Sequence, residues 1–60
     1  MDDHRTIVVP AANVRHIMSS YDLGGWAVTA IIPLVVDEKT YTPQLVSDDE
    51  QRFAVYMVRE

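Results

Sequence analysis

The chain has 60 residues, with nine acidic against five basic side chains, two histidines and no cysteine, and its formal net charge is −4. The absence of cysteine excludes disulfides and thiolate ligands, and two histidines are too few for a structural zinc site of the usual kind. The acidic balance argues against a general nucleic-acid binder, which needs excess Lys and Arg to neutralise phosphates.

A strand followed by a helix is predicted at the start of the chain. Residues 5–9, RTIVV, are short and mostly β-branched, which is typical of a strand. Pro10 ends this strand and also suits the first turn of a helix, where a missing N–H costs nothing. From Ala11 the apolar residues recur at i, i+3, i+4 and i+7, which is one face of a helix. These residues are Val14, Ile17, Met18 and Tyr21.

The helical pattern stops at Leu23, before two glycines and the only tryptophan. Gly24 stands at the C′ position, where a glycine adopts a positive φ without steric cost. Gly25 adds freedom for a sharp reversal. A hydrophobic residue just past such a cap packs back on the last helical turn, so we expect Trp26 to join the second strand to the helix.

The second predicted strand runs from Trp26 to Ile32 and is apolar on both sides. Alternation places Trp26, Val28, Ala30 and Ile32 on one side of this strand. A strand that is covered on one face only would carry polar residues on the other. Because one helix of about 12 residues cannot cover both faces of a sheet, we expect a second subunit to provide the remaining cover.

The rest of the chain is predicted to leave the sheet and return to it. Pro33 interrupts the strand pairing or lies at an edge. Residues 34–36 are expected to resume the strand, 37–40 to form a turn, 41–46 an extended return arm and 47–51 a polar loop. The final run, RFAVYMVRE, alternates cleanly and predicts a last strand antiparallel to the second. One face of it carries Phe53, Val55 and Met57, and the other carries Ala54, Tyr56 and Val58.

These elements predict a single small α+β domain over residues 1–60. One helix packs on a three- to four-stranded mixed or antiparallel sheet, and oligomerisation completes the fold. A lone chain of this size buries only about 60% of the surface that its unfolded form exposes. Small scaffolds are usually stabilised by disulfides, by a metal or by oligomerisation, and only oligomerisation is open to this sequence. We therefore expect a homodimer or a larger closed ring.

The pieces MSSYDLGGWAVTAIIP and RFAVYMVRE, in this order, resemble a widespread group of small bacterial and phage β-α-β-β domains of unknown function. In that group the helix ends in a Gly-Trp step, here Gly25-Trp26, and the resemblance covers most of residues 5–59. Segment 34–51 departs from the pattern because it is longer and more hydrophobic than a plain hairpin requires. The resemblance implies a fold and no activity. Some phage proteins of comparable size are oligomeric inhibitors, including sponges that trap nucleotide signals of host immunity.

The residues do not predict an enzyme, a metal site or a cofactor. The three serines lack the G-x-S-x-G context of a nucleophile elbow. His16 is predicted to be a solvated side chain on the polar face of the helix. The acidic clusters at 37–38 and 48–50 lack the spacing of a calcium loop and are predicted to be charged loop tips that keep the chain soluble. No stretch of 18 apolar residues and no signal peptide is present, so we expect a cytoplasmic protein without a membrane span.

Arginine and aromatic side chains are the candidates for ligand binding. Four of the five basic residues are Arg, whose planar fork matches phosphate or carboxylate, and aromatic rings stack on bases. The alternative is that the Arg side chains form salt bridges and that the tryptophan belongs to the core. The predicted ligand-binding set is Arg5, Arg15, Trp26, Arg52, Tyr56 and Arg59.

The sequence therefore predicts a non-catalytic, homo-oligomeric binding protein of the kind found in phages. It is expected to sequester a small anionic, nucleotide-like ligand between subunits. The alternative is a protein-interaction module or inhibitor that docks on a host protein through its acidic or apolar surface. An exposed apolar face marks an oligomer seam or a site for a different partner, and the sequence does not separate the two.

Overall fold

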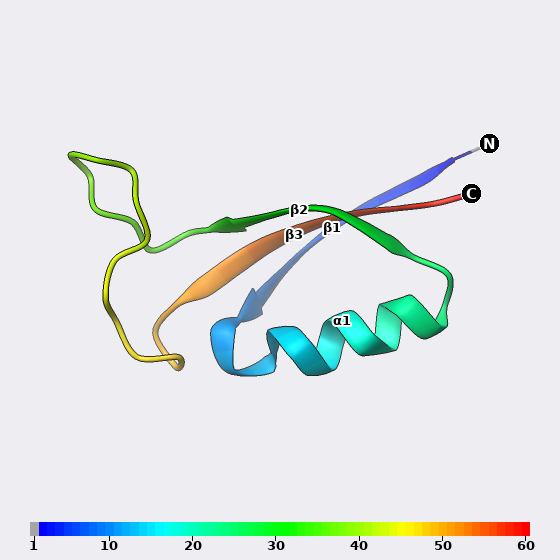
Figure 1. The fold of residues 1–60 in the computed structure, drawn as a ribbon, viewed down its shortest axis with the longest axis horizontal. Coiled ribbons are helices and arrows are strands. Elements are labelled where there is room, and N and C mark those ends of the chain that lie inside the picture. The colour runs from blue at the N-terminus through cyan, green and yellow to red at the C-terminus, as the bar shows by residue number, and fades with distance from the viewer. Residues whose placement is uncertain (1) are drawn as a thin grey trace.

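The computed structural model describes residues 2–60 and contains one helix and three strands (Figure 1). The elements in chain order are β1 (Asp3–Pro10), the 3-10 turn η1 (Ala11–Asn13), α1 (Val14–Leu23), β2 (Ala27–Pro33) and β3 (Arg52–Arg59). This order confirms the predicted α+β arrangement. The prediction that residues 34–36 resume the strand is wrong, because only a single bridge, Val36 to Pro43, forms there.

The three strands form one antiparallel sheet in the order β1-β3-β2. The last strand lies in the middle, paired with β1 from Asp3↔Arg59 to Pro10↔Arg52. It also pairs with β2, as predicted, from Ala27↔Val58 to Pro33↔Phe53. Both β1 and β2 are therefore edge strands, and the termini lie together at one end of the sheet (Figure 1).

A β-bulge in β2 changes which side chains share a face. The register shifts between Val28 and Ala30, which places Thr29 as the extra residue, and its Oγ1 lies 3.2 Å from the carbonyl oxygen of Tyr56. Val28 lies opposite Met57, on the helix side, whereas Ala30 lies opposite Tyr56 on the other side. The prediction that Val28 shares a face with Ala30 and Ile32 is therefore wrong, because an inserted residue inverts the alternation beyond it.

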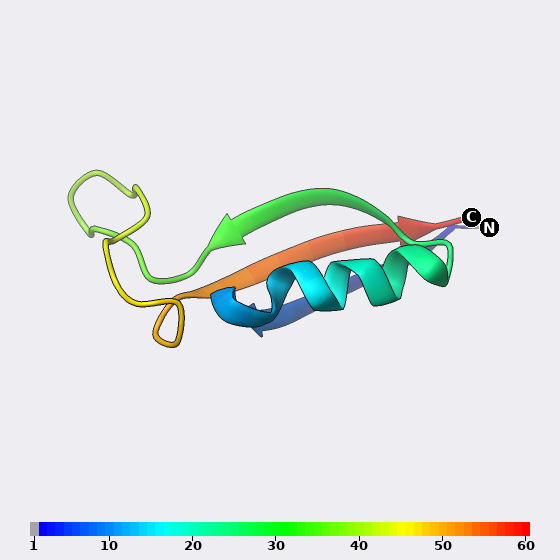
Figure 2. The same cartoon turned by 60° about the horizontal axis from the view of Figure 1, so that its bottom comes forward.

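Helix α1 covers one face of the sheet and covers it unevenly (Figure 2). The core consists of Val9, Trp26, Val55 and Met57, with Ile7, Val14, Ile17, Tyr21 and Phe53 packed against it. Side chains of β1 and β3 under the helix are buried. On β2, by contrast, Val28 is 36% exposed and Ile31 is 42% exposed although both face the helix side. The predicted apolar helix face is confirmed for Val14, Ile17 and Tyr21.

The helix ends in a Schellman motif that the two glycines and Trp26 complete. The N–H of Trp26 donates to the carbonyl of Tyr21 (3.1 Å), and the N–H of Gly25 donates to that of Asp22 (3.0 Å). The Trp26 ring meets Tyr21 edge-on with centroids 6.3 Å apart, which confirms that Trp26 packs back on the last turn. The positive φ falls on Gly25 (85°) and not on Gly24 (−87°), so the predicted C′ position is one residue too early.

A buried glutamine fastens the long loop to the opposite end of the helix layer. Gln51 is 7% exposed, and its side-chain amide both accepts from and donates to the backbone of Val35, at 3.0 Å each. Its Oε1 also accepts from the N–H of Arg52 (2.9 Å), and its backbone carbonyl accepts from the N–H of Ala11 (2.9 Å). Gln51 therefore ties the loop, β3 and the start of the helix layer together.

We predict that Gly25→Ala lowers the free energy of unfolding by about 1–2 kcal/mol, because an L side chain at a φ of 85° is strained. The matched control is Gly24→Ala. Its new Cβ meets Tyr21 O at 3.4 Å and Trp26 Cδ1 at 3.5 Å, so we expect a change within about 0.5 kcal/mol. Urea unfolding followed by Trp26 fluorescence at one protein concentration measures both. Equal losses in the two variants would contradict the motif.

We also predict that Gln51→Leu lowers the free energy of unfolding by about 2 kcal/mol, because it removes three hydrogen bonds of a buried side chain and leaves the part-buried N–H of Val35 without its acceptor. Gln44→Leu is the control, since the Gln44 side chain is exposed and no hydrogen bond is found for it within residues 2–60. The same urea titration compares the two variants. A larger loss from Gln44→Leu would refute the role of Gln51.

Candidate functional site

The sheet face opposite the helix carries no covering element within residues 2–60, and we call it the open face. Cross-strand partners share a face, so the register assigns its side chains in rows across the three strands. Two rows are Thr6–Tyr56–Ala30 and Val8–Ala54–Ile32, and a third joins His4, Val58 and Ala27. Val8 is 60%, Ile32 46% and Tyr56 39% exposed.

Charge is distributed unevenly between the two faces of the sheet. In the paired strands, none of the chain's nine acidic residues falls on the open face, and Asp3 lies on the helix side opposite Arg59. The ionisable side chains on the open face are His4, Arg52 and Tyr56, of which Tyr56 lies in the middle row. A flat apolar surface without carboxylates therefore exists on a chain whose net charge is −4.

A second cluster lies on the helix side, where the helix ends, and we call it the Arg–Trp cluster. It consists of Arg5 of β1, Arg59 of β3, Trp26 and Tyr21. The guanidinium Cζ of Arg5 lies 5.0 Å from the Trp26 ring and 5.8 Å from the Tyr21 ring, and that of Arg59 lies 4.6 Å from Trp26. Such cation–π contacts stabilise a fold by about 0.5–2 kcal/mol each.

The cluster leaves its arginines accessible and its tryptophan buried. Trp26 is 8% exposed, so its ring has little surface left on which a base could stack. Arg59 Nη2 forms an ion pair with Asp3 Oδ2 at 3.2 Å, and these two side chains are 44% and 58% exposed. Arg5 has no carboxylate within ion-pair distance among residues 2–60. The cluster therefore offers one free guanidinium beside one that is already neutralised.

The remaining three predicted residues lie apart from this cluster. The Arg52 guanidinium donates to the backbone carbonyls of Asp49 (2.6 Å) and Gln51 (3.2 Å), at the other end of the sheet. Tyr56 lies on the open face. Arg15 lies on α1 beside a groove. The structure thus brings together Arg5, Trp26 and Arg59 and separates Arg15, Arg52 and Tyr56 from them.

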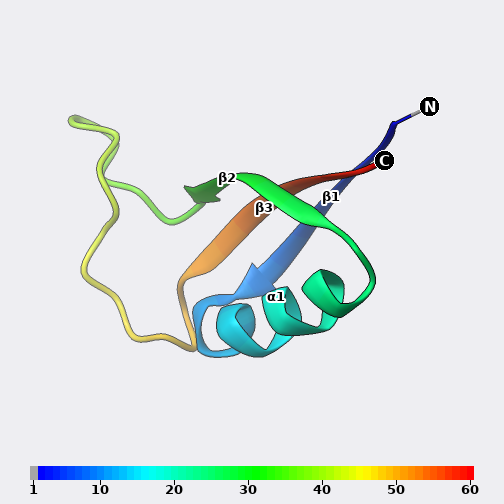
Figure 3. The same cartoon turned by 45° about the vertical axis from the view of Figure 1, so that its right-hand side comes forward.

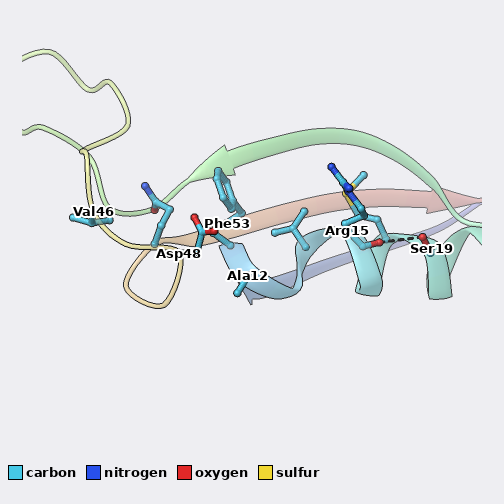
Figure 4. A pocket seen from close by; sticks show the side chains of 10 residues that line it. Ala12, Arg15, Ser19, Val46, Asp48 and Phe53 are labelled. Atoms are coloured by element: carbon cyan, nitrogen blue, oxygen red, sulfur yellow. Dashed lines mark hydrogen bonds between the residues drawn. The ribbon is translucent and has the colours of Figure 1, made fainter.

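A groove runs along α1 on the side that faces β2, and we call it the α1–β2 groove (Figure 4). It consists of two adjoining hollows of about 860 and 350 Å³, both lined by Met18 and Ser19. Phe53 and Arg15 extend into the larger hollow from the sheet and from the helix (Figure 4). The larger hollow lies between η1, α1, the loop around Val46 and Asp48, and Phe53 of β3, and only the smaller hollow reaches β2, at Ala27 and Val28. Polar and apolar side chains both line the groove, with Arg15 and Asp48 at the larger hollow and Asp22 at the smaller.

These surfaces offer guanidinium groups, which donate hydrogen bonds to anions, and apolar side chains, which pack against other apolar surfaces. Both kinds of group serve binding. Within the described part of the chain, no three His, Asp or Glu side chains gather closely enough to hold a metal ion. Nor does any helix there have the length and apolar character needed to cross a bilayer.

The predicted ligand-binding set lacks one member of the Arg–Trp cluster, Tyr21, and the ion-pair partner of another, Asp3. The sequence pattern places Tyr21 on the apolar helix face, and its position at C3 of the Schellman motif also brings it to Trp26. The contact of Asp3 with Arg59 joins residues that are 56 apart in sequence and requires the strand register. No short-range pattern predicts that pairing.

In comparisons with known proteins, no family model, no curated protein and no solved structure matches this chain. The kinship suggested by the Gly25-Trp26 step therefore stays a prediction.

Proposed function

We propose that this protein is a non-catalytic binding module that works as a homo-oligomer, in which two copies pack their open faces together. The observation that carries this proposal is the apolar open face, which has no carboxylate in any of its three rows. Two sheets pack face to face at about 10 Å when their facing side chains are apolar and of modest size. The three alanines of the open face, at positions 27, 30 and 54, leave room for such an approach.

The amount of exposed surface supports a missing partner. Compact monomers of 6.8 kDa expose about 4,000 Å² by the usual scaling, whereas this chain exposes 4611 Å². Its radius of gyration is 12.6 Å, against about 10.4 Å for a compact domain of 60 residues. The excess of roughly 600 Å² reflects the elongated shape, 39 × 21 × 11 Å, in which the open face and the projecting loop both stay exposed.

Charge favours a second copy as the occupant of the open face. Two copies of a chain with net charge −4 repel each other wherever their carboxylates meet. The open face is the broad surface of the sheet from which the carboxylates are absent, so two copies meet there with the least repulsion. A two-fold axis across it also makes the contact self-complementary.

We predict that Val8→Glu weakens self-association at least about tenfold, because it places a carboxylate in the apolar row Val8–Ala54–Ile32 of the proposed interface. The Val8 side chain is 60% exposed, so the variant keeps its fold, which circular dichroism checks. Sedimentation velocity over the micromolar range measures the association.

Ser20→Glu is the matched control, because it adds the same charge on an exposed position of α1 outside the open face. We expect it to associate like the unmodified chain. A chain that stays monomeric at all concentrations, or a Val8→Glu variant that associates as well as the unmodified chain, would overturn the proposal.

A second candidate function is the capture of a small anion by the Arg–Trp cluster. The specific observation is the Arg5 guanidinium, which is held against two aromatic rings and has no carboxylate partner among residues 2–60. Arg5 and Arg59 lie on the same face of adjacent strands, so one phosphate group can approach both. Stacking by Trp26 plays no part in this version of the site, because that ring is buried.

Calorimetric titration with nucleotides, including cyclic and ADP-ribose types, tests this candidate. We predict that Arg5→Met weakens binding at least about tenfold, because a charge-assisted contact is lost. Asp3→Asn is expected to strengthen binding, since it releases Arg59 and removes a competing carboxylate. Arg15→Met serves as the control, because Arg15 lies outside the cluster. No heat from any nucleotide, or equal effects of Arg5→Met and Arg15→Met, would refute it.

A further inference from the structure

The loop between β2 and β3 carries a structured projection, residues 35–45, which we call the finger. Its two sides are joined by the hydrogen bonds Asp37 N to Thr42 O (2.9 Å) and Gln44 N to Val35 O (3.0 Å) and by the single bridge between Val36 and Pro43. Its turn is closed by Tyr41 N to Asp37 O (2.7 Å) and capped by the Asp37 carboxylate, which accepts from Lys39 N (2.8 Å). The finger extends past the end of the sheet, away from α1 (Figures 1 and 3).

The finger presents large apolar side chains to solvent. Leu45 is fully exposed at 102%, and Tyr41 is 80% exposed. Tyr41 also has a φ of 56°, a left-handed conformation that is uncommon for a residue with a side chain. A hydrogen-bonded loop thus holds two large side chains outward, where they gain nothing from the chain's own core. They are the starting point for the contact proposed below.

The α1–β2 groove is a surface of matching character. Val14, Met18 and Phe53 provide an apolar lining in its larger hollow of about 860 Å³. One end of this hollow is lined by Val46, the residue directly after the finger. The finger points away from that end, so the tip of the finger does not fill the groove of its own chain.

One pair of opposite charges can join the two surfaces. The groove carries Arg15 and Asp48 at its larger hollow and Asp22 at the smaller, and the Arg15 guanidinium has no ion-pair or hydrogen-bond partner among residues 2–60. The finger carries Asp37, Glu38 and Lys39, a net charge of −1. The Asp37 carboxylate is already used as the cap of the turn, which leaves Glu38 as the free acid of the finger.

We propose that the finger of one copy docks in the α1–β2 groove of a second copy, with Leu45 and Tyr41 against the apolar lining and Glu38 near Arg15. This inference rests on the self-association proposed above and adds a second contact to it. The two contacts use different surfaces, because the groove lies on the helix side of the sheet and the first contact on the open face. Variants at the two surfaces therefore distinguish the finger contact from the open-face contact.

The test is carried out in chains that carry Val8→Glu, so that the open-face contact is weakened and the finger contact is read alone by sedimentation velocity. These chains are expected to show residual association at high concentration. Leu45→Ser is expected to weaken it at least about tenfold, since the main apolar anchor is lost. Leu23→Ser is the matched control, because Leu23 is 90% exposed and lies outside the finger, the groove and the open face. It should leave the association unchanged.

A charge exchange then tests the pairing in trans. Arg15→Glu alone and Glu38→Arg alone should each associate at least about tenfold more weakly, since each puts like charges together. An equimolar mixture of the two variants should recover the association, because each copy then offers the charge that the other lacks. Absence of residual association in Val8→Glu chains, equal effects of Leu45→Ser and Leu23→Ser, or no recovery in the mixture would each overturn the finger contact. None of these results bears on the open face, which the Val8→Glu comparison decides.

Discussion

A helix with its side chains is about 10 Å wide, whereas three paired strands span about 14 Å. Helix α1 lies over β1 and β3, where Val9, Val55 and Met57 are at most 4% exposed. It covers the helix side of β2 only in part, since Val28 is 36% and Ile31 42% exposed. This partial cover follows from the difference in width. The opposite face of the sheet stays open because a single helix covers only one face, and the proposed contacts use the surface that this shortage of covering elements leaves exposed.

The small core is held at both ends of the helix layer by specific polar geometry. At one end, the Schellman motif directs Trp26 onto Tyr21, and Arg5 and Arg59 approach the same indole from two strands. At the other end, the buried amide of Gln51 joins the loop to β3. The sequence has no cysteine, and no buried ion pair is found among residues 2–60, so these hydrogen bonds and cation–π contacts fix the packing of the core. The Arg–Trp cluster has a structural role whether or not it binds an anion.

The acidic residues lie away from the apolar open face. They lie in the loops, near the termini, at the end of α1 and on the helix side of β1, and the paired strands carry none of them on the open face. The net charge keeps separate copies apart in most orientations, while the open face and the groove remain usable. Arg15, Arg5 and the acid-free face are the places where the proposed contacts with a negatively charged or neutral partner meet no carboxylate of the same strand row or ion pair.

The sequence by itself determined the elements that depend on neighbouring residues: the first strand, the helix with its Val14, Ile17 and Tyr21 face, the glycine reversal and the alternation of the last strand. These rest on local periodicity and on the conformational freedom of glycine. Only the tertiary structure decided the rest. The bulge at Thr29, the central place of β3, the contact of Asp3 with Arg59 and the separation of Arg15, Arg52 and Tyr56 from the other candidates all depend on strand register. Register is fixed by pairing between residues far apart in the chain, and local patterns carry no record of it.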